Sequence, residues 1–147
     1  MKLLKYIAVG CLTIFILIIM NDAASFIPES TRKNLKKLSK LCMTKTNTSI
    51  ELIRASKERT LPRDPNYACY WACWFNTIGI MNEDNVIHLE HLYKVMPNET
   101  HSIIELLINE CGTQDGPEKC QIALNTMQCY VNTIPTLLSV HYAFLYE

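Results

Sequence analysis

The spacing of the cysteines constrains this chain more than any other feature. One of the seven, Cys11, lies in an N-terminal apolar segment that we expect to be removed, which leaves an even number. The remaining six are separated by 26, 3, 37, 8 and 8 residues, and they are Cys42, Cys69, Cys73, Cys111, Cys120 and Cys129. An even set of cysteines in a short exported chain is typical of a disulfide framework, so the sequence predicts three disulfides.

The N-terminal segment has the layout of a secretory signal peptide. Lys2 and Lys5 precede an apolar run over 7–20, and small residues follow at 23–25. The run is too short to cross a bilayer, which takes about 20 apolar residues for ~30 Å of hydrocarbon. We therefore expect cleavage after Ser25 and a secreted, extracellular protein. Removing 25 of the 147 residues leaves a mature domain of 122 residues, 26–147.

The charge balance excludes several classes of partner. The chain has 14 basic and 14 acidic residues, and a net charge near zero provides no long-range attraction to polyanions. A basic stretch near the start of the mature domain comprises Lys33, Lys36, Lys37 and Lys40. Such a stretch would suit a membrane-active domain, but a solvated helix face is the more ordinary interpretation. We expect neither nucleic-acid binding nor membrane insertion.

Apolar periodicity predicts one all-α domain of about six helices. The clearest pattern runs over 67–80, where aromatic and aliphatic residues recur at the three- and four-residue steps of one helical face. Similar patterns predict helices around 35–42 and over 50–57, 86–96, 99–111 and 117–132. After the last cysteine comes an apolar C-terminal tail, 131–147, which we expect to be buried against another part of the protein.

Helix geometry limits how the cysteines can pair. Cys120 and Cys129 lie nine residues apart on one expected helix, or roughly 13 Å at 1.5 Å per residue, whereas a disulfide needs Cα atoms within about 7 Å. A bridge between Cys69 and Cys73 would strain the helix that they share. Excluding both pairs leaves ten of the 15 connectivities that six cysteines allow. The helix over 67–80 is therefore expected to send two bridges to two other helices.

The cysteine pattern resembles that of the insect odorant-binding proteins, which include the pheromone-binding proteins. The matching features are the three residues between the second and third cysteines, the eight between the fifth and sixth, and Ala123 three residues after the fifth. The resemblance implies about six helices around an internal apolar cavity. It also implies three interlaced disulfides, which would be Cys42–Cys73, Cys69–Cys120 and Cys111–Cys129.

The same resemblance implies a secreted carrier of small hydrophobic ligands such as odorants or pheromones. It assigns the pocket lining to Trp71, Phe75, Asn76 and Tyr130, of which Asn76 and the Tyr130 hydroxyl could bond a ligand oxygen. Core packing is the alternative interpretation of each aromatic residue. An olfactory receptor or a homodimer is a further expected partner, and sensillum lymph or another secretion is the expected location. The alternative function is a carrier of the same fold outside olfaction, in saliva, venom or reproductive secretions.

No pattern in the sequence predicts catalysis, a cofactor or a metal. The sequence contains no His-x-x-x-His or Gly-x-Ser-x-Gly motif, and no cysteine is left over as a nucleophile. His88 with His91, and His101 with Glu105, have spacings that could hold a metal ion. Surface histidines are the commoner interpretation, so we expect no enzyme activity and no metal site.

The tail and two surface turns carry the remaining expectations. We expect 134–146 to form a lid or a plug at the cavity, with His141 as a pH switch because burial lowers the pKa of a histidine. The alternative is a tail packed on the outer surface with His141 exposed. The sequons at Asn47 and Asn98 are candidate glycosylation sites, with helix capping as the alternative role of Asn47.

Overall fold

The computed structural model describes residues 29–56 and 59–146, and the expected signal peptide, 1–25, lies outside the described residues. Within the described part the regular elements are α-helices and 3-10 helices, with one isolated β-bridge. They are α2 (Glu29–Thr46), α3 (Ile50–Ala55), α4 (Pro65–Thr77), the 3-10 helices η2 (Leu89–Lys94) and η3 (Asn98–Thr100), α5 (His101–Glu110), α6 (Lys119–Thr133) and α7 (Leu137–Tyr146). The predicted all-α fold is confirmed.

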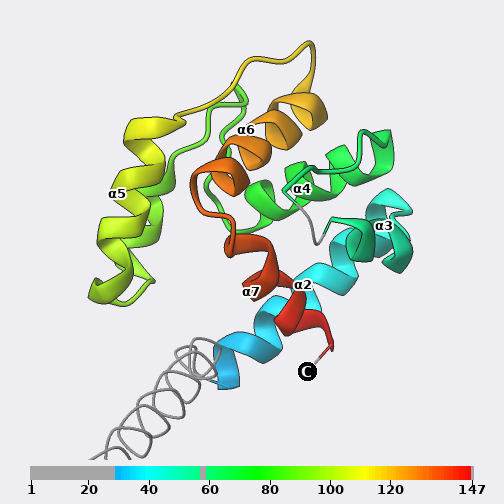
Figure 1. The fold of residues 1–147 in the computed structure, drawn as a ribbon, viewed down its shortest axis with the longest axis horizontal. Helices are drawn as coiled ribbons and strands as arrows, with labels where there is room; N and C mark the ends of the chain where they lie inside the picture. The colour runs from blue at the N-terminus through cyan, green and yellow to red at the C-terminus, as the bar shows by residue number, and fades with distance from the viewer. Residues whose placement is uncertain (1–28, 57–58, 147) are drawn as a thin grey trace, which may run out of the picture.

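Helix α4 is the centre of the fold, and it packs mainly against α6 and α2 (Figure 1). Its start is set locally, because the Asp64 side chain accepts a hydrogen bond from the backbone N–H of Tyr67 at 3.0 Å and Pro65 occupies the first turn. It ends before Gly79, whose positive φ of 77° stops a helix readily. Between these signals, seven of the 13 residues of α4 are buried.

Three disulfides tie the helices together. Cys42–Cys73 joins α2 to α4, Cys69–Cys120 joins α4 to α6, and Cys111–Cys129 joins the end of α5 to α6. These are the pairs implied by the family resemblance, and α4 sends two bridges to two other helices. The covalent links therefore hold α4 between the two helices that it packs against.

The predicted helix over 86–96 is wrong in both extent and type. Only Leu89–Lys94 is helical, and it is a 3-10 helix. Ile87 instead forms an antiparallel bridge with Met81, and the backbone N–H of Ile87 donates to the Thr113 hydroxyl at 2.8 Å. These partners are distant in sequence, and they hold the start of the segment in an extended conformation that local periodicity cannot indicate.

The C-terminal tail forms a helix, which the sequence analysis did not predict. Helix α7 packs against α2 and α6, and Figure 1 shows it crossing between them. Leu138 is 2% exposed and His141 is 9% exposed. The alternative of an outer-surface tail with an exposed His141 is therefore wrong. No helix in the described ranges is both long and apolar enough to cross a bilayer.

The two candidate glycosylation sites lie at the surface. Asn47 is exposed directly after α2 and has a positive φ of 54°, and Asn98 is exposed at the first position of η3. Their occupancy stays a prediction.

Candidate functional site: an aromatic pocket

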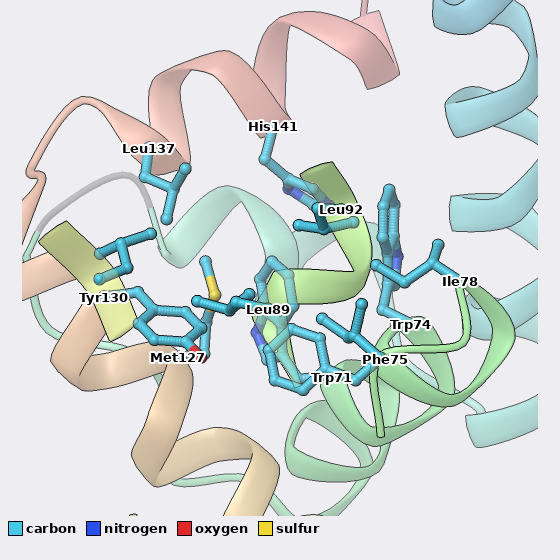
Figure 2. Close-up of a pocket in the computed structure, with 12 residues that line it drawn as sticks. Trp71, Trp74, Phe75, Ile78, Leu89, Leu92, Met127, Tyr130, Leu137 and His141 are labelled. Atoms are coloured by element: carbon cyan, nitrogen blue, oxygen red, sulfur yellow. The ribbon is translucent and has the colours of Figure 1, made fainter. Parts of the chain in front are cut away.

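An apolar pocket of about 210 Å³ lies where α4, α6 and α7 meet the segment that contains η2 (Figure 2). Every element around it contributes an apolar or aromatic side chain, and His141 is the lining residue with a basic side chain. The lining residues are Trp71, Trp74, Phe75, Ile78, Ile80, Leu89, Leu92, Leu107, Met127, Tyr130, Leu137 and His141. A mostly apolar concave site of this kind suits a small hydrophobic ligand.

The aromatic wall of the pocket comes from one face of α4. Trp71, Trp74 and Phe75 stand three and four positions apart, so helical geometry points them to the same side. The centroid of the Trp71 ring lies 6.3 Å from that of Trp74 and 6.2 Å from that of Phe75. The Phe75 ring continues to Tyr130 of α6 at 6.3 Å. The rings form one continuous surface across two helices.

Three polar groups in this wall are buried without a partner. The indole N–H groups of Trp71 and Trp74 and the hydroxyl of Tyr130 make no hydrogen bond within the described part of the chain. Burial raises the pKa of Tyr130, and the negative charge of Glu90 raises it further. The Tyr130 hydroxyl is therefore neutral at physiological pH.

His141 closes the pocket from the side of α7. Its ring centroid lies 4.9 Å from that of Trp71 and 5.2 Å from that of Trp74. Its Nε2 atom lies 2.9 Å from the hydroxyl of Tyr70, which in turn lies 2.6 Å from the hydroxyl of Ser39 on α2. Burial lowers the pKa of His141 to about 4, because desolvation penalises the charged form. The contacts join α2, α4 and α7 through a neutral imidazole.

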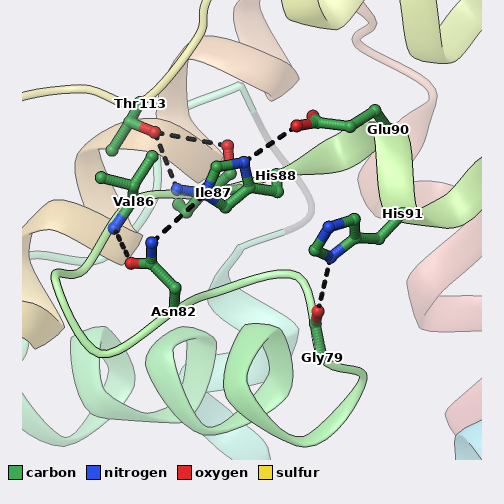
Figure 3. Close-up of polar contacts among 8 residues, drawn as sticks. All are labelled: Gly79, Asn82, Val86, Ile87, His88, Glu90, His91 and Thr113. Carbon is green, nitrogen blue, oxygen red and sulfur yellow. Dashed lines mark hydrogen bonds and ion pairs between the residues drawn. The ribbon is translucent and has the colours of Figure 1, made fainter.

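Polar contacts hold the wall opposite α4, which contains Leu89 and Leu92 (Figure 3). The His91 Nδ1 atom lies 3.1 Å from the carbonyl oxygen of Gly79, just after α4. Before η2, the Thr113 hydroxyl accepts the hydrogen bond from the backbone N–H of Ile87. These contacts anchor both ends of a short segment that has little regular structure of its own.

The histidine pairs considered as metal ligands have other partners. The His88 Nδ1 atom lies 2.8 Å from a Glu90 carboxylate oxygen, and its Nε2 atom lies 3.2 Å from the amide nitrogen of Asn82. The rings of His88 and His91 are stacked at 5.4 Å. His101 packs edge-on against the ring of Tyr93 at 4.9 Å. The described residues contain no group of three or more His, Cys, Asp or Glu side chains that could hold a metal ion.

Three of the four residues expected in the pocket lie in its wall, namely Trp71, Phe75 and Tyr130. Asn76 is a wrong prediction, since it is exposed and accepts a hydrogen bond from the Lys119 ammonium group at 3.2 Å. Successive side chains along a helix are rotated by about 100° around its axis. The side chain of Asn76 therefore points away from the face that carries Phe75.

The pocket also has lining residues that are not among those predicted from the sequence. Trp74 and Ile78 could have been found, because they follow the same helical periodicity as Trp71 and Phe75. Leu107 could not, because no local signal indicates which apolar residues of other helices face α4. Leu137 lies in the tail segment, 134–146, that is expected to form a lid or a plug at the cavity.

The comparisons with known proteins agree on one family. Residues 24–133 match the family model described as the PBP/GOBP family. General odorant-binding protein 69a of Drosophila melanogaster is 39% identical over 100 residues, which cover 67% of this chain and 68% of that protein.

Solved structures support the same assignment. The medfly odorant-binding protein CcapOBP22/CcapOBP69a has a TM-score of 0.72 at 32% identity and covers 78% of this chain and 99% of its own. Odorant-binding protein 7 of Anopheles gambiae, solved with an azo compound, has a TM-score of 0.77 at 28% identity. The match covers 82% of this chain and 99% of that protein's chain.

Proposed function

Because this chain belongs to the PBP/GOBP family of insect odorant-binding proteins, we propose that the aromatic pocket is its ligand site. The protein is a carrier of small hydrophobic ligands such as odorants or pheromones. The observation that carries the proposal is a pocket of about 210 Å³ whose lining is almost entirely apolar and aromatic. Trp71, Phe75 and Tyr130 are its proposed contact residues, with Trp74 added from the geometry.

The proposal extends to where the carrier works and what it meets. Family members are generally secreted, so we expect cleavage after Ser25 and release of the domain 26–147. The family consists of binding proteins rather than known enzymes, and we expect no catalytic activity. An olfactory receptor or a second copy of the chain is the expected macromolecular partner. The alternative role outside olfaction is not favoured by the relatives found.

A pocket-filling substitution tests the site directly. Leu107 lines the pocket and is 6% exposed, whereas its neighbour Leu106 is 43% exposed on the outer face of α5. We expect Leu107→Trp to fill part of the pocket and to weaken binding of propylbenzene, measured by calorimetry, by at least about tenfold, because one lost methylene contact alone is worth roughly fourfold. Leu106→Trp adds the same side chain outside the pocket and should bind as the unmodified protein does.

The controls separate loss of the site from loss of the fold. Overpacking costs about 1–3 kcal/mol, so both variants are first checked for helical circular dichroism and a cooperative thermal transition. If folded Leu107→Trp binds propylbenzene as tightly as Leu106→Trp does, the ligand site lies elsewhere.

A further inference from the structure

The accessible inner surface of the pocket is apolar throughout. Twelve residues line it, and none of them is a lysine, arginine, aspartate or glutamate. A ligand that fills this space without moving the wall therefore meets only apolar surface. Burial of a polar ligand group against such a surface removes its hydrogen bonds to water without replacing them.

The unpartnered donors of the wall, which include the Trp71 indole N–H, lie behind this surface. The Tyr130 hydroxyl and the Trp74 indole N–H are inaccessible to a probe of the size of water. A ligand oxygen has about the same radius, so it cannot reach either donor in this arrangement. Tyr130 as a whole is 3% exposed and Trp74 is 8% exposed. Both residues therefore contribute ring surface rather than a hydrogen bond.

The charges around the pocket disfavour an anionic ligand. His141 is the lining residue that could become a cation, but its buried ring has a pKa of about 4 and is neutral at physiological pH. The Glu90 carboxylate acts on this wall, since its negative charge raises the pKa of Tyr130. Hydrogen bonds hold the pKa of Glu90 below its ordinary value, so this group is negative at neutral pH. A ligand carboxylate would lose its water and be repelled.

The volume limits the size of the ligand. A cavity of about 150 Å³ lined by aliphatic and aromatic residues binds benzene, which corresponds to about 25 Å³ for each carbon. On this scale the pocket of about 210 Å³ holds roughly eight carbons. Ile78, at 38% exposed, is the most exposed lining residue and marks the open side. Additional atoms would extend past it into solvent.

We infer that the pocket selects neutral, compact ligands of about eight to ten non-hydrogen atoms through carbon surface alone and rejects carboxylic acids. The inference rests on the proposed function, because it names the ligand class of that same site. A relative of the same fold is described as a fatty acid binding protein from the blowfly Phormia regina, at 18% identity. This chain is expected to differ from it in the ligand class.

Pairs of ligands with equal shape test the chemistry of the pocket. Propylbenzene and 2-phenylethanol differ by a methyl group in place of a hydroxyl, and isobutylbenzene and phenylacetate differ by an isopropyl group in place of a carboxylate. We expect propylbenzene to bind at least about a hundredfold more tightly than 2-phenylethanol, because a buried hydroxyl without a partner is strongly disfavoured. Phenylacetate should show no saturable binding at neutral pH.

The Tyr130→Phe variant separates apolar contact from hydrogen bonding. It removes the hydroxyl and keeps the ring, so the preference for propylbenzene over 2-phenylethanol should stay within about twofold of the unmodified value. Two results would overturn the inference: binding of the alcohol within tenfold of the hydrocarbon, or a selective loss of alcohol binding in Tyr130→Phe. Saturable binding of phenylacetate would overturn it as well.

An alkylbenzene series tests the size limit. Affinity should rise about fourfold for each added methylene up to roughly ten carbons and then level off. A continued rise through hexylbenzene would refute the size limit. If the alcohol binds well but Leu107→Trp abolishes its binding, the proposed function stands and this inference fails. If Leu107→Trp binds every probe normally, or no probe binds at all, the proposed function itself fails.

Discussion

Acidification from pH 7 to pH 5 should loosen α7 from the rest of the domain. The cause is His141, which is buried against Trp71 and Trp74 and has its Nε2 atom 2.9 Å from the Tyr70 hydroxyl. Burial lowers its pKa from the ordinary 6.5 to about 4. When α7 leaves its site, the imidazole returns to water and its pKa returns to the ordinary value. Protonation therefore favours the undocked helix.

The size and sign of the effect follow from this difference in pKa. The undocked state binds more protons, so docking has its full stability above pH 6.5 and loses it as the pH falls toward 4. Each tenfold change in proton affinity is worth about 1.4 kcal/mol, so the total loss is about 3 kcal/mol once the pH is below 4. At pH 5 the loss is about 2 kcal/mol, or about thirtyfold in the docking equilibrium.

Hydrogen exchange of the α7 amides measures this equilibrium residue by residue. After correction for the intrinsic pH dependence of exchange, protection over 138–142 should fall by about twentyfold between pH 7 and pH 5. His141→Phe keeps an aromatic ring against Trp71 and Trp74 but does not titrate, so its protection should change by less than threefold. An equal fall in both proteins, or no fall in either, would refute the role of His141.

Ligand binding provides an independent measurement of the same event. Leu137 and His141 line the pocket, so α7 forms part of its wall and propylbenzene affinity should fall with acid. A chain that ends at Thr133 should bind propylbenzene more weakly at pH 7 and show little further change at pH 5. If truncation leaves the affinity and its pH dependence unchanged, α7 is not a lid; if acid strengthens binding in the full chain alone, α7 acts as a plug.

Two further predictions concern stability. Replacement of both Cys111 and Cys129 by serine should lower the free energy of unfolding in urea by roughly 3 kcal/mol. The reason is that the bridge, which spans a sequence separation of 18, restricts the unfolded chain; an unchanged transition midpoint would contradict this. Gly116→Ala should destabilise by at least about 1 kcal/mol, because its Cβ would lie 2.7 Å from the backbone nitrogen of Ile122. Gly116→Ser should lower the free energy of unfolding by at least as much. If neither substitution changes the free energy of unfolding, the loop before α6 adjusts freely.

The helices that the sequence predicted well are those with strong local signals. Helix α4 has a capping aspartate at Asp64, a proline in its first turn and an uninterrupted apolar face, and all three act between residues close in sequence. The same holds for α6, whose predicted range, 117–132, differs from the observed one by one or two residues at each end. Helix ends are the least sharply defined part of such a prediction.

The wrong predictions have a different origin. Asn76 follows Phe75 by one position, and the rotation of about 100° per residue along α4 turns its side chain away from the pocket. At 86–96, contacts to Met81 and Thr113 hold residue 87 in an extended conformation. In the tail, helix formation goes with packing against α2 and α6, in keeping with short helices that depend on tertiary contacts.

By itself, the sequence determined an all-helical chain with a disulfide framework, a central aromatic helix and an apolar tail, because spacing and periodicity are local properties of the chain. Only the tertiary structure decided which sides of the helices enclose a pocket, since that depends on where α6, α7 and η2 come to lie against α4. It also decided that the donors of Trp74 and Tyr130 lie behind the pocket surface. Whether a polar atom is exposed depends on every neighbour that packs around it, and those neighbours come from helices far apart in the sequence.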